Sequence, residues 1–529
     1  MANFAHRTRT ALILGSLLAL PSCISFAPDK ALPDTVAELP DSYGKEISQQ
    51  TYQPKAWWSA FEDPMLDALV EEAMRDNLDI AASAARLEQV RAQARVARAA
   101  LYPTLDATGA SSYSDSPLAG TGFDGFGPGD GGDGGGFPAL DRLVIENYTL
   151  SLAAGYELDL FGRIRNDAAA ALRDTLAARY DYRAIQLSTA AEVISAYFDI
   201  VDARRQIGLA ESTINVLAER TAQTEGRFNQ GLIDSLELYQ IREDFRNVQS
   251  ALPQREALLT SNEGRLALLL RDYPAAMSER LNQPLTPRLV FEPVPTGMPM
   301  ELLSQRPDVA AAWFRMEAAR LRVGARKAER FPRLSLSGSV GTQGANVSGA
   351  FDVIDNWVLS LGANLTAPIF QGGRIRANIE AAEASYAEAT ANYAQSVLSA
   401  FREVVAALNS YEKNRERYTL IVSQRAEAEA SLAVQQRRFS AGIGNYISYL
   451  DALRGLYQVD TSLSTAARDV AIARLDVHRA LGGDWVMDSE VEPVPLIETE
   501  KDPVRDDVAD GDVIGDHEAK PKRSGDKTQ

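Results

Sequence analysis

The chain has 529 residues, of which 45% are hydrophobic and 24% charged, and its formal net charge at pH 7 is −18. The negative charge disfavours nucleic acid as a partner, and a single cysteine excludes an internal disulfide and a cysteine-based metal site. The length alone suggests several domains, and the apolar content is sufficient to bury a core.

Residues 1–22 are typical of a lipoprotein signal peptide. Basic residues precede a short apolar core over residues 11–20, which is too short to span a membrane and is soon followed by Cys23. A lone cysteine at this place resembles a bacterial lipobox, so we expect diacylglyceryl attachment and amine acylation at Cys23. The alternative is an ordinary signal peptide with an incidental thiol. Ile24 and Ser25 lack the acidic residue of an inner-membrane retention signal, which favours the outer membrane.

Residues 23–56 are predicted to form an extended, lipidated leader, and the ordered part begins at Trp57. A segment of strongly helical composition covers residues 64–100, and its counterpart in the second half covers residues 300–330. An aromatic-proline pair ends each segment, because proline cannot continue a helix and pushes its predecessor toward extended geometry.

Strands are predicted after each of these helices. Apolar residues alternate with small polar residues from Tyr148 to Leu160 and again from Trp357 to Leu365. One apolar and one small polar face over about ten residues is the pattern of a membrane barrel strand, although a half-buried strand of a soluble sheet alternates in the same way. After Cys23 the chain lacks the run of ~18 uninterrupted apolar residues that a transmembrane helix requires, so any crossing by the mature chain must use strands.

The loops that join the two strands of each half differ in length. Residues 116–140 form a long, glycine-rich loop, whereas residues 341–355 form a shorter one. Long loops on one side and short connections on the other suit an outer-membrane barrel. The glycine-rich loop lacks the repeated nonapeptide of calcium-binding turns, so a calcium site is not predicted there.

Two pairs of long helices are predicted next. The first pair is a helix over residues 163–229 and an antiparallel helix over residues 235–271, which Pro253 is expected to interrupt. The second pair is a helix over residues 374–440 and an antiparallel helix over residues 446–481. A helix over residues 374–440, which contain neither glycine nor proline, would be about 100 Å long, or roughly three times the thickness of a bilayer's hydrocarbon core. Each half therefore contributes an antiparallel helical hairpin.

The breaks between the paired helices carry local signals for tight turns. Gly231 and Gly442 can adopt the positive φ that closes a helix end. Asp234 and Asn445 can cap the helices that follow. These residues place the two hairpin tips near residues 229–235 and 440–446.

The two halves repeat each other. From Arg163 to Gly231 in the first half, and from Arg374 to Gly442 in the second, the offset between equivalent residues is 211. We predict two repeats, residues 57–298 and 299–484. Repeats that flank strands with such helices describe a long tube, not an enzyme with a pocket.

A chain with four membrane strands must assemble with copies of itself. Four strands cannot close a barrel, and an open sheet edge in lipid leaves unpaired backbone groups that cost several kcal/mol each. Two copies would give eight strands with an interior filled by side chains, whereas three would give twelve strands with room for a water-filled lumen.

The repeat resembles the TolC/OprM outer-membrane efflux proteins, in particular the lipoprotein branch that works with RND-type pumps. The stretches that carry the resemblance are Arg306-Pro-Asp-Val-Ala-Ala-Ala, Phe331-Pro-Arg-Leu-Ser-Leu-Ser-Gly, Pro368-Ile-Phe-Gln-Gly-Gly-Arg374, Phe439-Ser-Ala-Gly-Ile-Gly-Asn-Tyr446 and Ala480-Leu-Gly-Gly-Asp-Trp485. The resemblance implies a mainly α, internally duplicated fold with membrane β. In it, long helical hairpins form a trimeric periplasmic α-barrel that continues into a twelve-strand outer-membrane β-barrel.

The resemblance implies the outer-membrane channel of a tripartite efflux system. Such a homotrimer is a passive conduit, gated at its periplasmic end, that receives substrate from an inner-membrane RND transporter through a periplasmic adaptor (membrane fusion) protein. The exit duct of a type I protein-secretion system is a related alternative, and a periplasmic coiled-coil scaffold without a pore is one from another class. The lipobox and the motif ending at Trp485 favour efflux.

An enzyme is not predicted. The three histidines, His6, His478 and His517, are far apart in the sequence. A Cys/His cluster, a glycine-rich phosphate loop and a nucleophile elbow are all missing from the sequence. Apart from the lipid on Cys23, we expect no cofactor and no metal.

The resemblance also implies a periplasmic gate near the second hairpin. Ile447 falls where the family has an apolar ring residue, and Asp451 falls where it has an acidic one. One helical turn separates them, so they can share a lumen-facing stripe on which three carboxylates repel anions and attract cations. The alternatives are interhelical packing for Ile447 and a solvated helix surface for Asp451. Tyr446 and Tyr449 either hydrogen-bond to a neighbouring helix and latch the closed state, or only pack.

The hairpin tips match the family's adaptor-contact position. The residues concerned are Gly231, Leu232, Ser235, Gly442 and Ile443. An exposed Leu232 or Ile443 at a periplasmic tip is unfavourable without a partner, although self-contained capping of the hairpin is the alternative.

At the other end of the chain, residues 485–529 form an acidic tail, predicted to be disordered and without a specific role.

Overall fold

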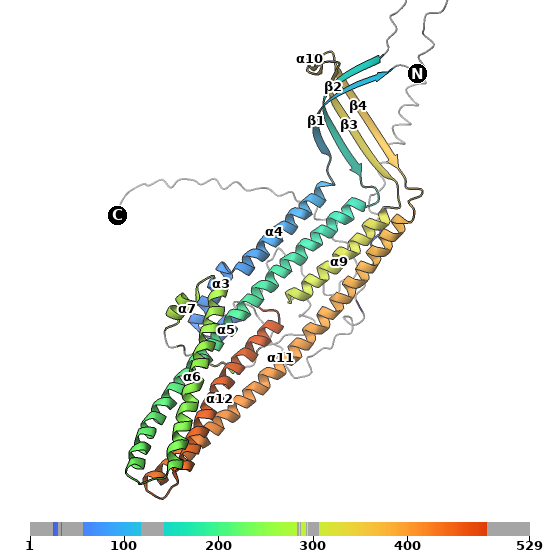
Figure 1. Cartoon of the computed structure of the whole chain (residues 1–529). Helices are drawn as coiled ribbons and strands as arrows, with labels where there is room; N and C mark the ends of the chain where they lie inside the picture. The colour runs from blue at the N-terminus through green and yellow to red at the C-terminus, as the bar shows by residue number, and fades with distance from the viewer. Residues whose placement is uncertain are drawn as a thin grey trace, which may run out of the picture.

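The structure, a computed structural model, describes residues 25–29, 33, 57–117, 142–282, 285, 287–291, 294 and 306–483. The signal peptide, Cys23, most of the leader, residues 118–140 of the glycine-rich loop and the acidic tail lie outside the described residues. The described part is a long rod with a four-stranded sheet at one end and the tips of two helical hairpins at the other (Figure 1).

Each half contains the same elements in the same order. The first half has α4 (Leu78–Ala99), β1 (Thr104–Pro117), β2 (Arg142–Leu158), α5 (Arg163–Asn229) and α6 (Ser235–Leu269). The second half has α9 (Pro307–Ala328), β3 (Arg333–Gly344), β4 (Trp357–Thr366), α11 (Arg374–Ser440) and α12 (Tyr446–Ala480). Equivalent helices have equal lengths of 22, 67 and 35 residues. The predicted internal duplication is confirmed.

Short elements lie beside these repeats. The 3-10 helix η1 (Trp57–Phe61) and helix α3 (Pro64–Asp76) precede α4, α7 (Pro274–Arg280) follows α6, and α10 (Val347–Ala350) lies between β3 and β4.

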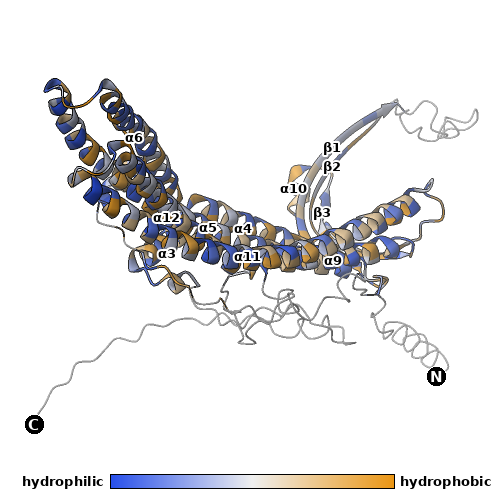
Figure 2. Cartoon of the chain, turned by 90° about the horizontal axis from the view of Figure 1, so that it is seen from below, coloured by the Kyte–Doolittle hydropathy of each residue, from blue (hydrophilic) through white to orange (hydrophobic). Residues whose placement is uncertain are grey.

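The long helices are continuous, as predicted, and at 1.5 Å per residue each 67-residue helix is about 100 Å long. Apolar and polar residues are interleaved along them (Figure 2). The prediction that Pro253 interrupts the returning helix is wrong, because α6 continues through it. Proline removes one helical hydrogen bond and crowds the preceding turn, which a helix held by its neighbours can tolerate.

The segment predicted as one helix over residues 64–100 consists of two helices that meet at Asn77. The Asn77 side chain accepts hydrogen bonds from the backbone N–H groups of Asp79 and Ile80, which caps α4. Its Nδ2 donates to the carbonyl oxygen of Leu269, 2.9 Å away at the end of α6. The break in the helix is therefore fixed by a contact with a distant part of the chain.

The sheet has the order β1-β2-β3-β4, and every neighbouring pair is antiparallel. The register places Ala107, Leu152, Val340 and Leu359 opposite one another across the four strands. The adjacent row is small or polar: Asp106, Ala153, Ser339 and Ser360. Because side chains alternate between faces, the sheet has one apolar and one small polar face. The predicted alternation is confirmed.

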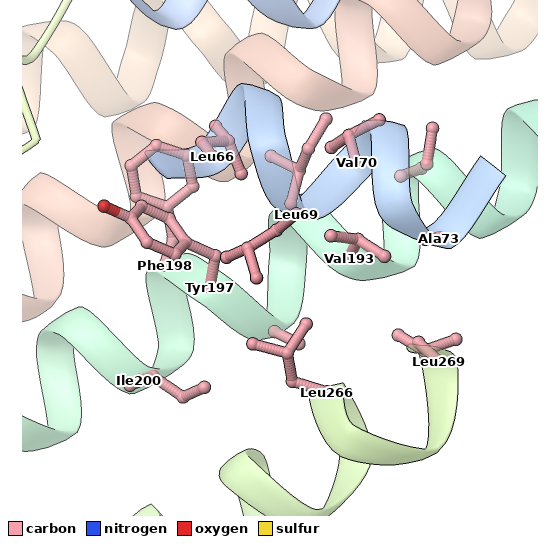
Figure 3. Packing of buried hydrophobic residues seen from close by; sticks show 14 of the residues in the cluster. Leu66, Leu69, Val70, Ala73, Val193, Tyr197, Phe198, Ile200, Leu266 and Leu269 are labelled. Carbon is pink, nitrogen blue, oxygen red and sulfur yellow. The ribbon is translucent and has the colours of Figure 1, made fainter. Parts of the chain in front are cut away.

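A core at mid-length joins the N-terminal helices to the first hairpin. Side chains of α3, α5 and α6 interdigitate there, including Leu66, Leu69, Val193, Tyr197 and Leu266 (Figure 3). The Tyr197 hydroxyl donates to the carboxylate of Asp63, the N-cap of α3, over 2.5 Å.

Within the described residues, α5 alone is long and apolar enough to cross a membrane, and 56% of its most apolar window is buried in the fold.

Candidate gate and hairpin tips

We define hairpin 1 as α5 with α6, and hairpin 2 as α11 with α12. Both hairpins end in the same backbone motif. In hairpin 1 the N–H of Gly231 donates to the carbonyl of Phe228 over 2.8 Å, and the N–H of Leu232 donates to that of Arg227 over 3.0 Å. Hairpin 2 has the same pair of bonds, and Gly231 and Gly442 have φ values of 72° and 71°. This Schellman arrangement closes both long helices as their sequences predict.

The predicted tip residues lie at the end of the rod farthest from the sheet (Figure 1). Leu232 and Ile443 are 64% and 74% exposed, and Ser235, the first residue of α6, is also exposed. The side chains of Asp234 and Asn445 cap the helices that follow. Each turn is therefore complete by itself, and its apolar residue still faces outward. Contact with an adaptor stays a prediction.

The two predicted tyrosines of the gate are buried between the hairpins. Tyr446 and Tyr449 are 5% and 4% exposed and pack with Leu217 and Ile241 of hairpin 1. The ring centroid of Phe439 lies 5.1 Å from that of Tyr446 and 5.9 Å from that of Tyr449. We call Phe439, Tyr446 and Tyr449 the aromatic cluster. It fixes hairpin 2 against hairpin 1.

One face of α5 contacts this cluster through three polar side chains. Arg220 lies over the Tyr449 ring at 5.6 Å and Arg227 over the Phe439 ring at 5.8 Å, both within the range of a cation–π interaction. Between them, Thr224 Oγ1 is 3.2 Å from the Tyr446 hydroxyl. Tyr446 therefore packs and hydrogen-bonds at the same time. Burial raises its pKa, so the phenol is neutral at physiological pH.

Asp451 takes part in an ionic link between the hairpins. Its side chain is 59% exposed and lies 2.9 Å from Nη1 of Arg454, one turn further along α12. The Nε of Arg454 lies 2.6 Å from Oδ1 of Asp244 on α6, whose side chain is only 11% exposed. The hydrogen bond to Asp244 is the main cause of a raised pKa of Arg454. One guanidinium thus joins two carboxylates from different hairpins.

The four predicted gate residues therefore divide into two pairs. Tyr446 and Tyr449 are inside the chain, whereas Ile447 is half-buried on the first turn of α12 and Asp451 is exposed. The latter pair keeps surface that can face a lumen, and its role in a gate stays a prediction.

The sequence interpretation missed the residues of hairpin 1 that contact the aromatic cluster and Arg454. Arg220, Thr224 and Arg227 were detectable as a polar stripe at helical spacing. Asp244 had no comparable signal, because its partner Arg454 lies 210 residues away in the sequence.

Comparisons with known proteins agree with the architecture. The family model for "Outer membrane efflux protein" matches residues 69–270 and 298–483. The outer membrane protein OprJ of Pseudomonas aeruginosa is 33% identical, over 88% of this chain and 94% of its own length. The solvent efflux pump outer membrane protein SrpC of Pseudomonas putida is 30% identical, over 89% of this chain and 97% of its own.

The outer-membrane channel OprN, a solved structure, superposes with a TM-score of 0.77 at 28% identity. The match covers 86% of this chain and 98% of that one. The predicted combination of long helical hairpins with a small antiparallel sheet is thus the fold of a known channel. The chain belongs to the outer membrane efflux protein family.

Proposed function

We propose that this protein is the outer-membrane channel of a tripartite, RND-type efflux system, a passive conduit from the periplasm to the exterior. The observation that carries the proposal is a sheet with one apolar face and two free edges, continuous with helices about 100 Å long. The sheet lies in the outer membrane, and the helices extend into the periplasm. SrpC, which is named as the outer membrane protein of a solvent efflux pump, supports this assignment.

The free edges of β1 and β4 explain why the channel is a homotrimer. In a four-stranded antiparallel sheet the first and last strands run in opposite directions. The β4 strand of one copy can therefore pair, antiparallel, with β1 of the next. This pairing removes the unpaired backbone groups that lipid does not tolerate. Three copies give a twelve-stranded barrel with an aqueous lumen, whereas two give an eight-stranded barrel filled by side chains.

The gate lies at the tips of the hairpins. Ile447 and Asp451 line the closed end, while the aromatic cluster and the Arg454–Asp244 pair hold α12 against hairpin 1. Opening requires α12 to move away from α5 and α6. The free energy for this motion comes from contacts with partners, because the sequence carries no glycine-rich phosphate loop that would bind a nucleotide.

The hairpin tips and the N-terminal cysteine indicate what the channel binds. The exposed Leu232 and Ile443 support docking of a periplasmic adaptor at the tips, and the adaptor connects the channel to an inner-membrane RND transporter. A diacylglyceryl group on Cys23, which lies outside the described residues, anchors each copy in the outer membrane. The channel itself needs no cofactor and no metal.

Electrophysiology tests the function. The purified protein, reconstituted in planar bilayers, should form trimers with low resting conductance that open in discrete steps. A periplasmic scaffold would give no conductance at any concentration. Deletion of the gene should reduce tolerance to small toxic compounds and leave protein export intact. Loss of an exported protein from the medium, with unchanged tolerance, would point instead to type I secretion.

A further inference from the structure

The internal duplication creates two kinds of contact between hairpins in the proposed trimer. Within one chain, hairpin 1 contacts hairpin 2 through the aromatic cluster. Around a ring of three copies, the free face of hairpin 2 must meet the free face of hairpin 1 of the next copy. The hairpins have helices of equal length, and their bounds differ by a constant 211 residues. The contact between copies should therefore repeat the contact within a chain, with each residue replaced by its counterpart 211 positions away.

This rule can be applied to the cation–π pair at the tips. Within the chain, the guanidinium carbon of Arg227 lies 5.8 Å from the ring centroid of Phe439. The counterpart of Arg227 is Arg438, and the counterpart of Phe439 is Phe228. Arginine followed by phenylalanine occurs at both positions in the sequence. Exchanging hairpin 1 and hairpin 2 therefore again places an arginine opposite a phenylalanine.

Both counterparts are available to a second copy. Phe228 is 38% exposed although it is a large aromatic residue, and Arg438 is exposed on the last turn of α11. Within the described ranges, the structure shows neither a hydrogen bond nor an ion pair for the Arg438 guanidinium. Its neighbour Arg437 differs, because its Nε donates to the carbonyl of Ala433 on the same helix.

We propose that Arg438 of each copy packs over Phe228 of the next copy. Three Arg227–Phe439 pairs within chains and three Arg438–Phe228 pairs between chains then alternate around the periplasmic end of the conduit. The inference rests on the proposed trimer, and it identifies the residues that close the ring at the tips.

Three other contacts between the hairpins near the tips do not survive the exchange. The counterparts of Arg220 and Tyr449 are Ser431 and Leu238, those of Thr224 and Tyr446 are Gln435 and Ser235, and those of Asp244 and Arg454 are Gly455 and Glu243. None of these three pairs reproduces the cation–π contact, tyrosine hydroxyl bond or ion pair of the original. At the tips, the contact between copies is thus poorer than the contact within a chain, and Arg438–Phe228 is its principal specific element.

Cross-linking of the full-length protein tests the pairing. In the proposed lipoprotein a thioether to diacylglycerol blocks the thiol of Cys23, so cysteines introduced by Phe228→Cys and Arg438→Cys would be the only free thiols. A short bis-maleimide should convert this double variant into covalent dimers and trimers on a denaturing gel. The matched control, Arg227→Cys with Phe439→Cys, should cross-link within one chain and therefore migrate on the gel as a single chain. Phe228→Cys alone should give no ladder.

The outcomes separate this inference from the proposed function. If the protein is a trimer in detergent and the double variant gives no link between copies, while the control pair links internally, the pairing is wrong and the channel assignment stands. If the unmodified protein is a lone chain, the channel assignment and the pairing both fail.

A second measurement does not depend on introduced thiols. Arg438→Gln should lower the temperature at which the trimer dissociates on a gel, whereas Arg438→Lys, which keeps the cation, should restore most of the loss. Arg437→Gln, one residue away, should leave the temperature unchanged. Equal effects of the Arg437 and Arg438 variants would overturn the pairing.

Discussion

Replacing Arg454 by glutamine should open the periplasmic end, because Arg454 forms an ion pair between α12 and hairpin 1 close to the tips. Its Nε lies 2.6 Å from Oδ1 of Asp244, and Asp244 is nearly buried. The other oxygen of that carboxylate, Oδ2, is buried without a hydrogen-bond partner in the described part of the chain. Loss of the guanidinium therefore leaves a buried carboxylate with neither oxygen paired to a cation.

The size of the effect follows from this environment. A hydrogen bond to a charged group contributes about 1.5–3 kcal/mol, and the lower end applies because the Arg454 side chain is 48% exposed. Three copies that open together would lose about 4.5 kcal/mol, or roughly two thousandfold in the ratio of closed to open channels. Asp244→Asn should have a smaller effect, because it removes the buried charge together with the pair and leaves Arg454 bound to Asp451.

Single-channel recording in planar bilayers measures this ratio directly. The matched control is Arg425→Gln. The Nε of Arg425 lies 2.7 Å from Oδ1 of Asp460, in an ion pair that joins α11 to α12 inside hairpin 2. It has similar geometry but does not connect the two hairpins. Equal conductance in Arg454→Gln and in the unmodified protein, or equal increases in Arg454→Gln and Arg425→Gln, would refute the role of the link.

Three further predictions concern other parts of the molecule. Cys23→Ala should abolish labelling by radioactive fatty acid, and intact labelling would contradict lipidation. Asp451→Ala combined with Ile447→Gly should enlarge the resting conductance; unchanged currents would remove both residues from the gate. Burial lowers the pKa of His478 in the folded chain from 6.5 to about 3. Between these pH values the unfolded chain binds the proton and the folded chain does not, so the free energy of unfolding falls by about 2 kcal/mol from pH 7 to pH 5. His478→Phe, which keeps an aromatic ring against Trp57, should flatten this loss in thermal unfolding curves at the two pH values, whereas an unchanged slope would show that the histidine is not its source.

The features that the sequence predicted correctly are those with local causes. The hairpin turns follow from Gly231 and Gly442, which accept a positive φ, and from Asp234 and Asn445, whose side chains cap the next helix. The strands follow from alternation, because a register with one apolar face requires apolar residues at every second position.

The features that it missed depend on distant contacts. The break at Asn77 is fixed by Leu269, and α6 continues through Pro253 within a packed bundle. The link from Arg454 to Asp244 joins different repeats and has no local pattern. A resemblance to a family proposed Ile447 and Asp451 as gate residues, whereas the contacts of hairpin 1 with the aromatic cluster and with Arg454 are visible only in the structure.

Native mass spectrometry of protein extracted from outer membranes in mild detergent tests the central claim most directly, namely that the free strand edges of each chain are satisfied by neighbouring copies. We predict a particle with the mass of three lipidated chains. A stable particle with the mass of one chain would contradict it.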